Sequence, residues 1–147
     1  MRRVATAFAL ATLIFAQACA DESAPVDAYV DGQEQMTDDG AFKVTLYHQD
    51  GVAQVGDNTF FLRVAVPVPG DDASEGRGVP RAMLDLQAEM LDTDYRMSVE
   101  PVVSYEGDGV YRLENVMLDR AGDWSLDIGI RIGSVEEHAS FSFSIEA

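Results

Sequence analysis

The second part of the chain alternates apolar and polar residues with a period of two. Phe42, Val44 and Leu46, for example, are separated by polar residues. Successive side chains of a strand point to opposite faces, so this alternation predicts half-buried strands. The pattern recurs in seven segments, residues 42–46, 60–66, 84–88, 99–103, 111–113, 124–132 and 141–145. No segment shows a sustained helical period, so we expect an all-β domain.

Turn-forming residues separate these segments. Asp50-Gly51, Gly107-Asp108-Gly109 and Ala121-Gly122-Asp123 lie between neighbouring strands, where glycine accepts positive φ without steric cost. Residues 67–80 form a longer loop rich in Gly, Pro and acidic residues. Seven short strands in residues 41–147 predict one seven-stranded, immunoglobulin-like β-sandwich. A small barrel is the main alternative.

The first eighteen residues have a different character. Arg2 and Arg3 precede an apolar run over residues 4–15, and Ala16-Gln17-Ala18 then leads to Cys19, the only cysteine. This order of charged, apolar and small residues is typical of a secretory signal peptide. The run is shorter than the roughly 20 residues that a spanning helix needs. We therefore expect residues 1–18 to be removed and the protein to be exported.

The cysteine behind the small residue resembles a bacterial lipoprotein signal. The resemblance implies that Cys19 becomes the lipid-bearing N-terminus at the periplasmic face of the cell membrane or at the outer membrane. Each buried CH₂ of an acyl chain adds about 0.8 kcal/mol of membrane affinity. Ordinary cleavage after Ala18 or Ala20, which would leave no lipid, is the alternative. Residues 19–40 contain seven acidic residues, no Lys or Arg and no apolar period, which predicts a flexible linker.

The chain is strongly acidic, with a formal charge of −16. Removal of residues 1–18 leaves 8 basic against 26 acidic residues, a formal charge of −18. Such a chain is repelled by nucleic acids and anionic headgroups. The charge therefore argues against a nucleic-acid partner. It fits either a solvated acidic surface or a protein that binds cations.

Two stretches resemble the YtkA-like domain family, which is similar to FixH and CopC-type β-sandwich proteins. Residues 56–64, Gly-Asp-Asn-Thr-Phe-Phe-Leu-Arg-Val, resemble the family's Gly-x-Asn-x-Phe opening of an early strand. Gly109-Val110-Tyr111 and Gly122-Asp123-Trp124 resemble its Gly-x-Tyr and Gly-x-Trp. Residues 139–143 match its closing strand. The resemblance spans the whole predicted domain and implies a sandwich fold, with links to copper handling or oxidase assembly in related proteins.

A metal site is the sharpest chemical hypothesis. Family members often carry a loop of the form Met-Pro-x-Met-x-His, and residues 89–97 correspond to it without the proline and histidine. Thioethers and imidazoles are ligands that copper prefers, so Met90, Met97, His48 and His138 are the candidate ligands. Methionines that fill core gaps and solvated strand-end histidines are the structural alternative. We expect no bound cofactor, and copper is the alternative.

The sequence contains no Gly-x-Ser-x-Gly, no His-Glu-x-x-His and no phosphate-binding glycine loop. We therefore expect no enzymatic activity. The first hypothesis is a lipid-anchored, non-enzymatic binding or assembly module of the cell envelope, with a protein partner. Strand edges and the loops at 67–80 and 89–97 would serve for recognition. The second is a periplasmic copper carrier or accessory protein for copper handling or respiratory oxidases.

Overall fold

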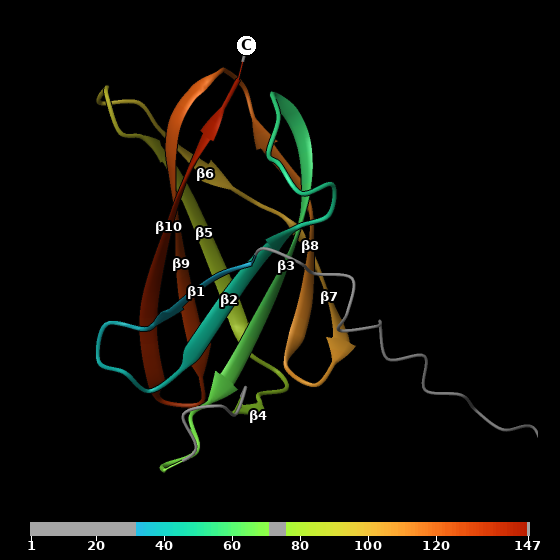
Figure 1. Cartoon of the computed structure of the whole chain (residues 1–147), viewed down its shortest axis with the longest axis vertical. Helices are drawn as coiled ribbons and strands as arrows, with labels where there is room; N and C mark the ends of the chain where they lie inside the picture. Colours follow the sequence, from blue (N-terminus) through green and yellow to red (C-terminus); the bar gives the residue numbers. More distant parts are fainter. Residues whose placement is uncertain (1–31, 71–75, 147) are drawn as a thin grey trace, which may run out of the picture.

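The computed structural model describes residues 32–70 and 76–146, which form two antiparallel sheets packed face to face (Figure 1). The first sheet has the order β1-β2-β3-β8-β7, with β4 beside β3, and the second has the order β10-β9-β5-β6. The strands are β1 (Gln33–Met36), β2 (Lys43–His48), β3 (Gly56–Val66), β4 (Arg77–Gly78), β5 (Met83–Met90), β6 (Arg96–Val99), β7 (Val102–Gly107), β8 (Val110–Leu118), β9 (Gly122–Ile132) and β10 (Val135–Ile145). The predicted all-β sandwich is confirmed. Within the described ranges, no helix has the length and apolarity needed to cross a bilayer.

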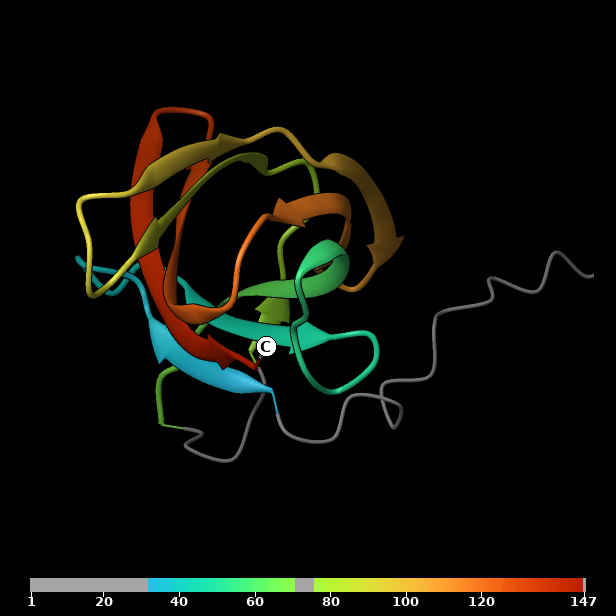
Figure 2. The ribbon, with the colours of Figure 1, turned by 90° about the horizontal axis from the view of Figure 1, so that it is seen from above.

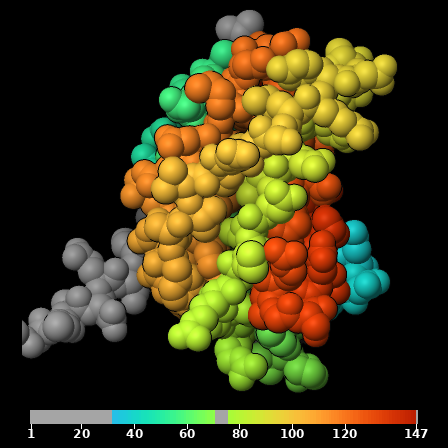
Figure 3. Space-filling view, turned by 180° about the vertical axis from the view of Figure 1, so that it is seen from behind, coloured from blue at the N-terminus to red at the C-terminus, as the bar shows by residue number. Residues whose placement is uncertain are grey.

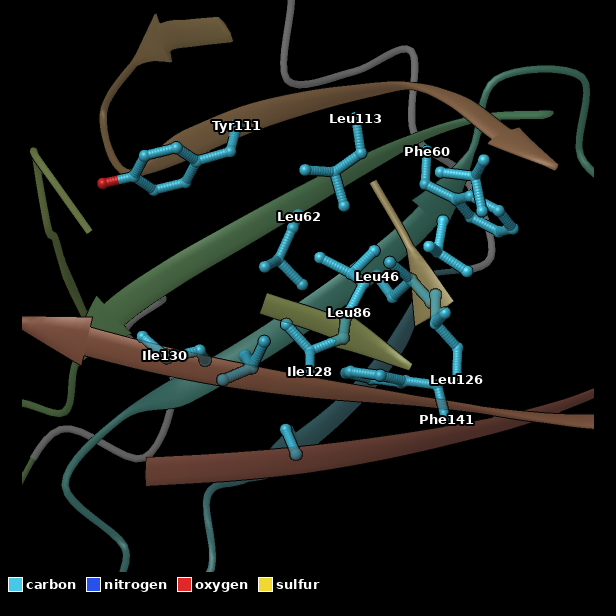
Figure 4. Close-up of a cluster of buried hydrophobic side chains, with 14 of the residues drawn as sticks. Leu46, Phe60, Leu62, Leu86, Tyr111, Leu113, Leu126, Ile128, Ile130 and Phe141 are labelled. Carbon is cyan, nitrogen blue, oxygen red and sulfur yellow. The ribbon is translucent and has the colours of Figure 1, made fainter. Parts of the chain in front are cut away.

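The core is formed by the alternating residues that the sequence analysis assigned to the inner faces. On β9, Trp124, Leu126, Ile128 and Ile130 are fully buried. Side chains of both sheets meet between the layers, as Leu86 and Leu62 illustrate (Figure 4). Each buried aliphatic or aromatic side chain contributes about 1.5–3 kcal/mol by leaving water. This core closes the domain without a disulfide.

The number of strands differs from the prediction, because ten strands are present among the described residues. One difference arises at the predicted strand 99–103, which is two strands. β6 ends at Val99 in the second sheet, and β7 begins at Val102 in the first. Pro101 between them has no N–H to donate to a ladder. The chain therefore changes sheets at Glu100-Pro101 (Figure 2).

The predicted linker 19–40 is wrong over residues 33–40. β1 pairs with β2, Gln33 opposite Leu46 and Met36 opposite Lys43, and Thr37 is buried. Thr37 Oγ1 accepts a hydrogen bond from the Phe42 N–H at 3.1 Å. Residues 20–31 of the predicted linker, the signal peptide 1–18 and Cys19 lie outside the described residues.

β1 also closes one flank of the sandwich. The Gln33 and Gln35 amides donate to the backbone carbonyls of Ser142 and Ser140 on β10, at 2.9 and 2.5 Å. The Asp38 N–H donates to the carbonyl of His138 at 3.1 Å. Three alternate carbonyls on the outer edge of β10 are thus bonded. β1 therefore links the edge of one sheet to the edge of the other.

Candidate functional site

The candidate ligands Met90 and Met97 lie on the β5–β6 hairpin. Both are half-buried and pack against the core. The Met90 methyl group fills the space beside Gly122, because a Cβ at position 122 would lie only 2.6 Å from Met90 Cε. Met97 lies opposite Ala88, a buried residue. In this arrangement the two thioethers serve as packing groups.

The tip of this hairpin is tied to the turn between β8 and β9. Tyr95 Oη donates to Asp119 Oδ2 at 2.6 Å, and the Arg120 guanidinium lies 3.7 Å from the centre of the Tyr95 ring. Trp124 Nε1 donates to the Arg120 carbonyl at 3.0 Å. Tyr95 occupies the neighbourhood where the resembling family has a histidine. Its hydroxyl and ring are engaged in holding the hairpin in place.

This cluster shifts the protonation equilibria of its members. The hydrogen bonds from Arg120 and then Tyr95 hold the pKa of Asp119 below its ordinary value of 3.8. The bond to Asp119 raises the pKa of Tyr95 above 10.0, and the same carboxylate raises the pKa of Arg120. The ionised Asp119 and the neutral Tyr95 are therefore the stable forms near neutral pH. The hydroxyl proton of Tyr95 stays on Tyr95 and takes part in the hydrogen bond to Asp119. The cluster therefore has a structural role.

His48 belongs to a hydrogen-bond network at the end of β2. The Asp50 N–H donates to His48 Nδ1 at 3.1 Å, which assigns the ring proton to Nε2, and Nε2 donates to Asn58 Oδ1 at 3.0 Å. The ring also meets Phe60 edge to face, with centroids 4.9 Å apart. Both ring nitrogens therefore have protein partners. A metal would have to displace one of them.

Asn58, which the sequence analysis noted only as part of Gly-x-Asn-x-Phe, organises this network. It is buried, and its Nδ2 contacts the carbonyl oxygens of Gln54, Gly56 and Val116 at 2.8, 2.9 and 3.3 Å. Its Oδ1 also accepts from the Gln54 N–H at 2.8 Å. The loop before β3 is folded around this one amide. The motif asparagine is a structural residue.

The tyrosine of the Gly-x-Tyr motif has a similar structural role. Tyr111, from Gly-x-Tyr, is buried, and its hydroxyl donates to the Val79 carbonyl at 2.6 Å and accepts from the Ala82 N–H at 2.8 Å. Burial raises the pKa of Tyr111. The hydroxyl fastens the segment before β5 to the core, and Figure 4 shows the Tyr111 side chain as part of the buried cluster. The motifs behind the family resemblance thus specify a fold.

His138 is exposed on the outer face of the second sheet. It borders a depression of about 310 Å³ over Gly129. A Cβ at Gly129 would lie 3.4 Å from His138 Cε1 and 3.6 Å from Asp85 Cβ, so His138 and Asp85, on the two strands that pair with β9, flank Gly129. The depression is also lined by Met83, Arg131 and Glu136. The residues around His138 come from β5, β9 and β10. They could not be identified from the sequence, because they depend on how these strands are aligned in the sheet.

The structure does not bring the four candidate ligands together. His48 lines a separate hollow with Phe60 and Phe143, and Phe143 lies five residues from His138 along β10, about 16 Å in an extended strand. In the part of the chain that the structure describes, no group of three His, Cys, Asp or Glu side chains is arranged to hold a metal ion. The four candidate ligands therefore do not form one common site in the described structure.

Apolar side chains are exposed on the flank of the sandwich opposite β1. We call this surface the open flank and define it as the outer edge of β7 from Val102 to Tyr105. Val102, Val103 and Tyr105 are 54%, 41% and 48% exposed. β7 pairs with β8 on one side and, among the described strands, has no partner on the other. β6 covers only residues 86–89 of β5. Figure 3 shows β7 and β5 on the same side of the molecule.

Comparisons with known proteins identify the fold. No protein-family model matches the chain, and no curated protein sequence matches it. Among solved structures, a DUF4426 family protein from Pseudomonas aeruginosa PAO1 is similar with a TM-score of 0.52 and 14% identity, over 77% of this chain and 96% of that one. FetP from uropathogenic Escherichia coli strain F11, expressed in the periplasm, is similar with a TM-score of 0.51 and 10% identity, over 77% and 92%.

A copper-bound variant of FetP is similar with a TM-score of 0.50 and 12% identity, over 79% of this chain and 95% of that one. At such identities the likeness establishes only the β-sandwich fold, which matches nearly the whole length of these neighbours. It does not assign the YtkA-like family to this chain.

Proposed function

We propose that this chain is a non-enzymatic binding module of the cell envelope, held to a membrane by a lipid on Cys19. The observation that carries the proposal is the open flank. Most of the polar side chains at the candidate sites, those of His48, Asn58, Tyr95 and Asp119, are engaged in holding the fold. The open flank instead exposes neighbouring apolar side chains, as protein-binding surfaces do.

The proposed anchor and the described domain are connected by a short segment. Twelve residues lie between Cys19 and Gly32, and a fully extended chain spans at most about 3.5 Å per residue. The domain would therefore remain within about 45 Å of the bilayer surface. A partner recognised by the domain would be held at the membrane.

Mass spectrometry of the mature N-terminus tests the anchor. We expect cleavage before Cys19 and a diacyl- or triacyl-modified cysteine, and we expect Cys19→Ala to release the protein from the membrane fraction. Cleavage after Ala20, or an unmodified Cys19 in a membrane-free protein, would contradict the anchoring.

Site-specific photocrosslinking in intact cells tests the binding function. A photoreactive amino acid is placed at four exposed positions: Val103 on the open flank, Val52 in the β2–β3 loop, Leu91 at the hairpin tip and Met83 on the second sheet. A binding module gives a discrete protein adduct from one surface and none from the others. Absence of adducts from all four surfaces would contradict the proposal.

Copper binding is the second candidate function, and two observations favour it. A variant of FetP, which has a similar fold, has been solved with copper bound. In addition, the exposed residues His138 and Asp85 lie on either side of Gly129, and both line the depression that Met83 also borders. Imidazole with carboxylate oxygen suits Cu(II). Because this site offers few ligands, we expect weak binding.

Electron paramagnetic resonance during a Cu(II) titration separates the two functions. The copper function predicts a nitrogen-coordinated signal at micromolar copper that is lost in His138→Ala and retained in the control Met97→Leu. A signal that does not depend on His138, or none at micromolar copper, would remove this candidate. The binding-module proposal does not depend on the result.

A further inference from the structure

We infer that the open flank accepts an extended, positively charged segment of a partner protein as an additional strand of the first sheet. The inference rests on the proposed function and names its site and the chemistry of its partner. The two flanks of the sandwich differ. On the β1 flank, three hydrogen bonds connect β1 and the residues after it to the outer carbonyls of β10. The open flank has no such cover in the described structure.

The sheet switch at Pro101 produces this difference. If β6 continued beyond Val99, it would pair with Met83–Asp85, the first three residues of β5. The chain instead joins the first sheet, so β7 becomes an edge and Met83–Asp85 pairs with β9 alone. Two unpaired strand edges thus border the same side of the molecule. An edge strand presents a row of N–H and C=O groups to any additional strand.

The open flank lacks the features by which natural proteins block such edges. Its residues are Val-Val-Ser-Tyr, of which the two valines and the tyrosine favour β structure, and none carries a charge. Edges are usually blocked by a charged residue, often lysine, by proline, or by a bulge. Here Pro101 and the bulge between Tyr105 and Gly107 lie only at the two ends. The four residues between them are available for pairing.

The side chains of the open flank suit alternating apolar residues on the incoming strand. Val103 lies opposite the buried Leu113, and Tyr105 lies opposite the buried Tyr111, with ring centroids 5.2 Å apart. Val103 and Tyr105 therefore belong to the inner face, yet both stay partly exposed. An apolar side chain from an added strand would extend this face at the rim of the core. About 25 cal/mol is gained per Å² of apolar surface that is buried.

Charge selects the partner. Glu100 and Glu106 lie just outside the open flank, and Glu106 accepts a hydrogen bond from Ser104 Oγ at 3.1 Å. On β8, Arg112 and Glu114 pair with each other at 3.1 Å, which leaves the acidic residues in excess. The whole chain carries −16, so pairing of two copies would bring together two strongly negative molecules. A strand flanked by Lys or Arg is attracted instead.

A pair of synthetic peptides tests the inference on the mature protein. The basic peptide is Lys-Lys-Val-Thr-Val-Thr-Val-Lys-Lys, and the matched peptide has Glu in place of every Lys. We expect the basic peptide to bind at least about tenfold more tightly at low salt and to lose affinity as salt rises. Nuclear magnetic resonance should locate the shifted amides on β7. A basic peptide with Pro at the central Val, which lacks that N–H, should bind more weakly.

Two variants of matched charge complete the test. Val103→Lys places a charge on the open flank, and Met117→Lys places one at an exposed β8 residue that β7 does not cover. Val103→Lys should abolish peptide binding, and Met117→Lys should reduce it only slightly. Equal effects of the two variants, amide shifts confined to other strands, or no binding would overturn the inference. A dimer that Val103→Lys dissociates would also overturn it, because the occupant would then be a second copy.

Failure of strand addition can be distinguished from failure of the binding function. If crosslinking in cells gives an adduct from another surface while the peptides do not bind β7, strand addition is wrong and the binding module stands. If no surface gives an adduct, the module itself fails.

Discussion

The side-chain amide of Asn58 takes part in five hydrogen-bond contacts, and its removal gives a quantitative prediction. A carboxamide has two N–H donors and two acceptor lone pairs, and Asn58 uses both sides toward His48, Gln54, Gly56 and Val116. In Asn58→Ala these groups lose their partner. The side chain is only 3% exposed, so water does not reach the position freely.

The expected loss follows from the number of bonds. The two N–H donors and two lone pairs allow at most four full hydrogen bonds among these five contacts. At about 1 kcal/mol each, they give an upper value near 4 kcal/mol. Gln54 is exposed and its backbone groups can be hydrated again, which lowers the loss to about 3 kcal/mol. A change of this size lowers the melting temperature of a domain of this length by about 10 °C.

Trp124 provides the assay. It is the only tryptophan and is fully buried, so its fluorescence in urea reports the exposure of the core. Gln49→Ala, an exposed polar residue of the neighbouring loop, is the control and should stay within about 0.5 kcal/mol of the wild type. A double-mutant cycle with His48→Phe should give a coupling energy of about 1 kcal/mol. A loss below about 1 kcal/mol in Asn58→Ala would refute the role of this network.

Three further predictions concern Asp119 beside the hairpin tip, Gly122 at the start of β9 and Gln35 on the β1 flank. Because the folded pKa of Asp119 lies below 3.8, its contribution to stability is present above about pH 4 and is lost as the pH falls through the folded pKa. The stability gap between wild type and Asp119→Asn should therefore shrink on acidification, and a gap that is constant with pH would contradict this. Gly122→Ala should cost about 1–2 kcal/mol in urea melts, since the φ of +138° strains any side chain. An unchanged midpoint would show that the backbone relaxes. Gln35→Ala should cost at most about 1 kcal/mol globally but should accelerate amide exchange in β1, whereas Gln87→Ala, an exposed residue of β5, should not.

The residues on the inner faces of the sheets were predictable, because large apolar residues occur at every second position along the strands. Leu126, Ile128 and Ile130 illustrate this: each was assigned to the core and each is fully buried. β1 was not predictable in this way. Its glutamines carry no apolar period, and they function through bonds to β10 residues more than 100 positions away.

The candidate site was harder to predict, because neighbours across a sheet depend on register. The sequence indicated His138 but gave no reason to place Asp85 beside it, which follows from the pairing of both strands with β9 around Gly129. Pro101 was present in the predicted strand 99–103, and its missing N–H was the one available signal of the sheet switch. The open flank follows from that switch.

Amide hydrogen exchange along β7 tests most directly that the open flank is a binding edge. In the free protein, the amides of Val102–Tyr105 that point away from β8 should exchange rapidly, because no strand covers them. The basic peptide should slow their exchange at least about tenfold, while the acidic peptide should leave it unchanged. Slow exchange of all four amides in the free monomer, or no change with the basic peptide, would contradict the account.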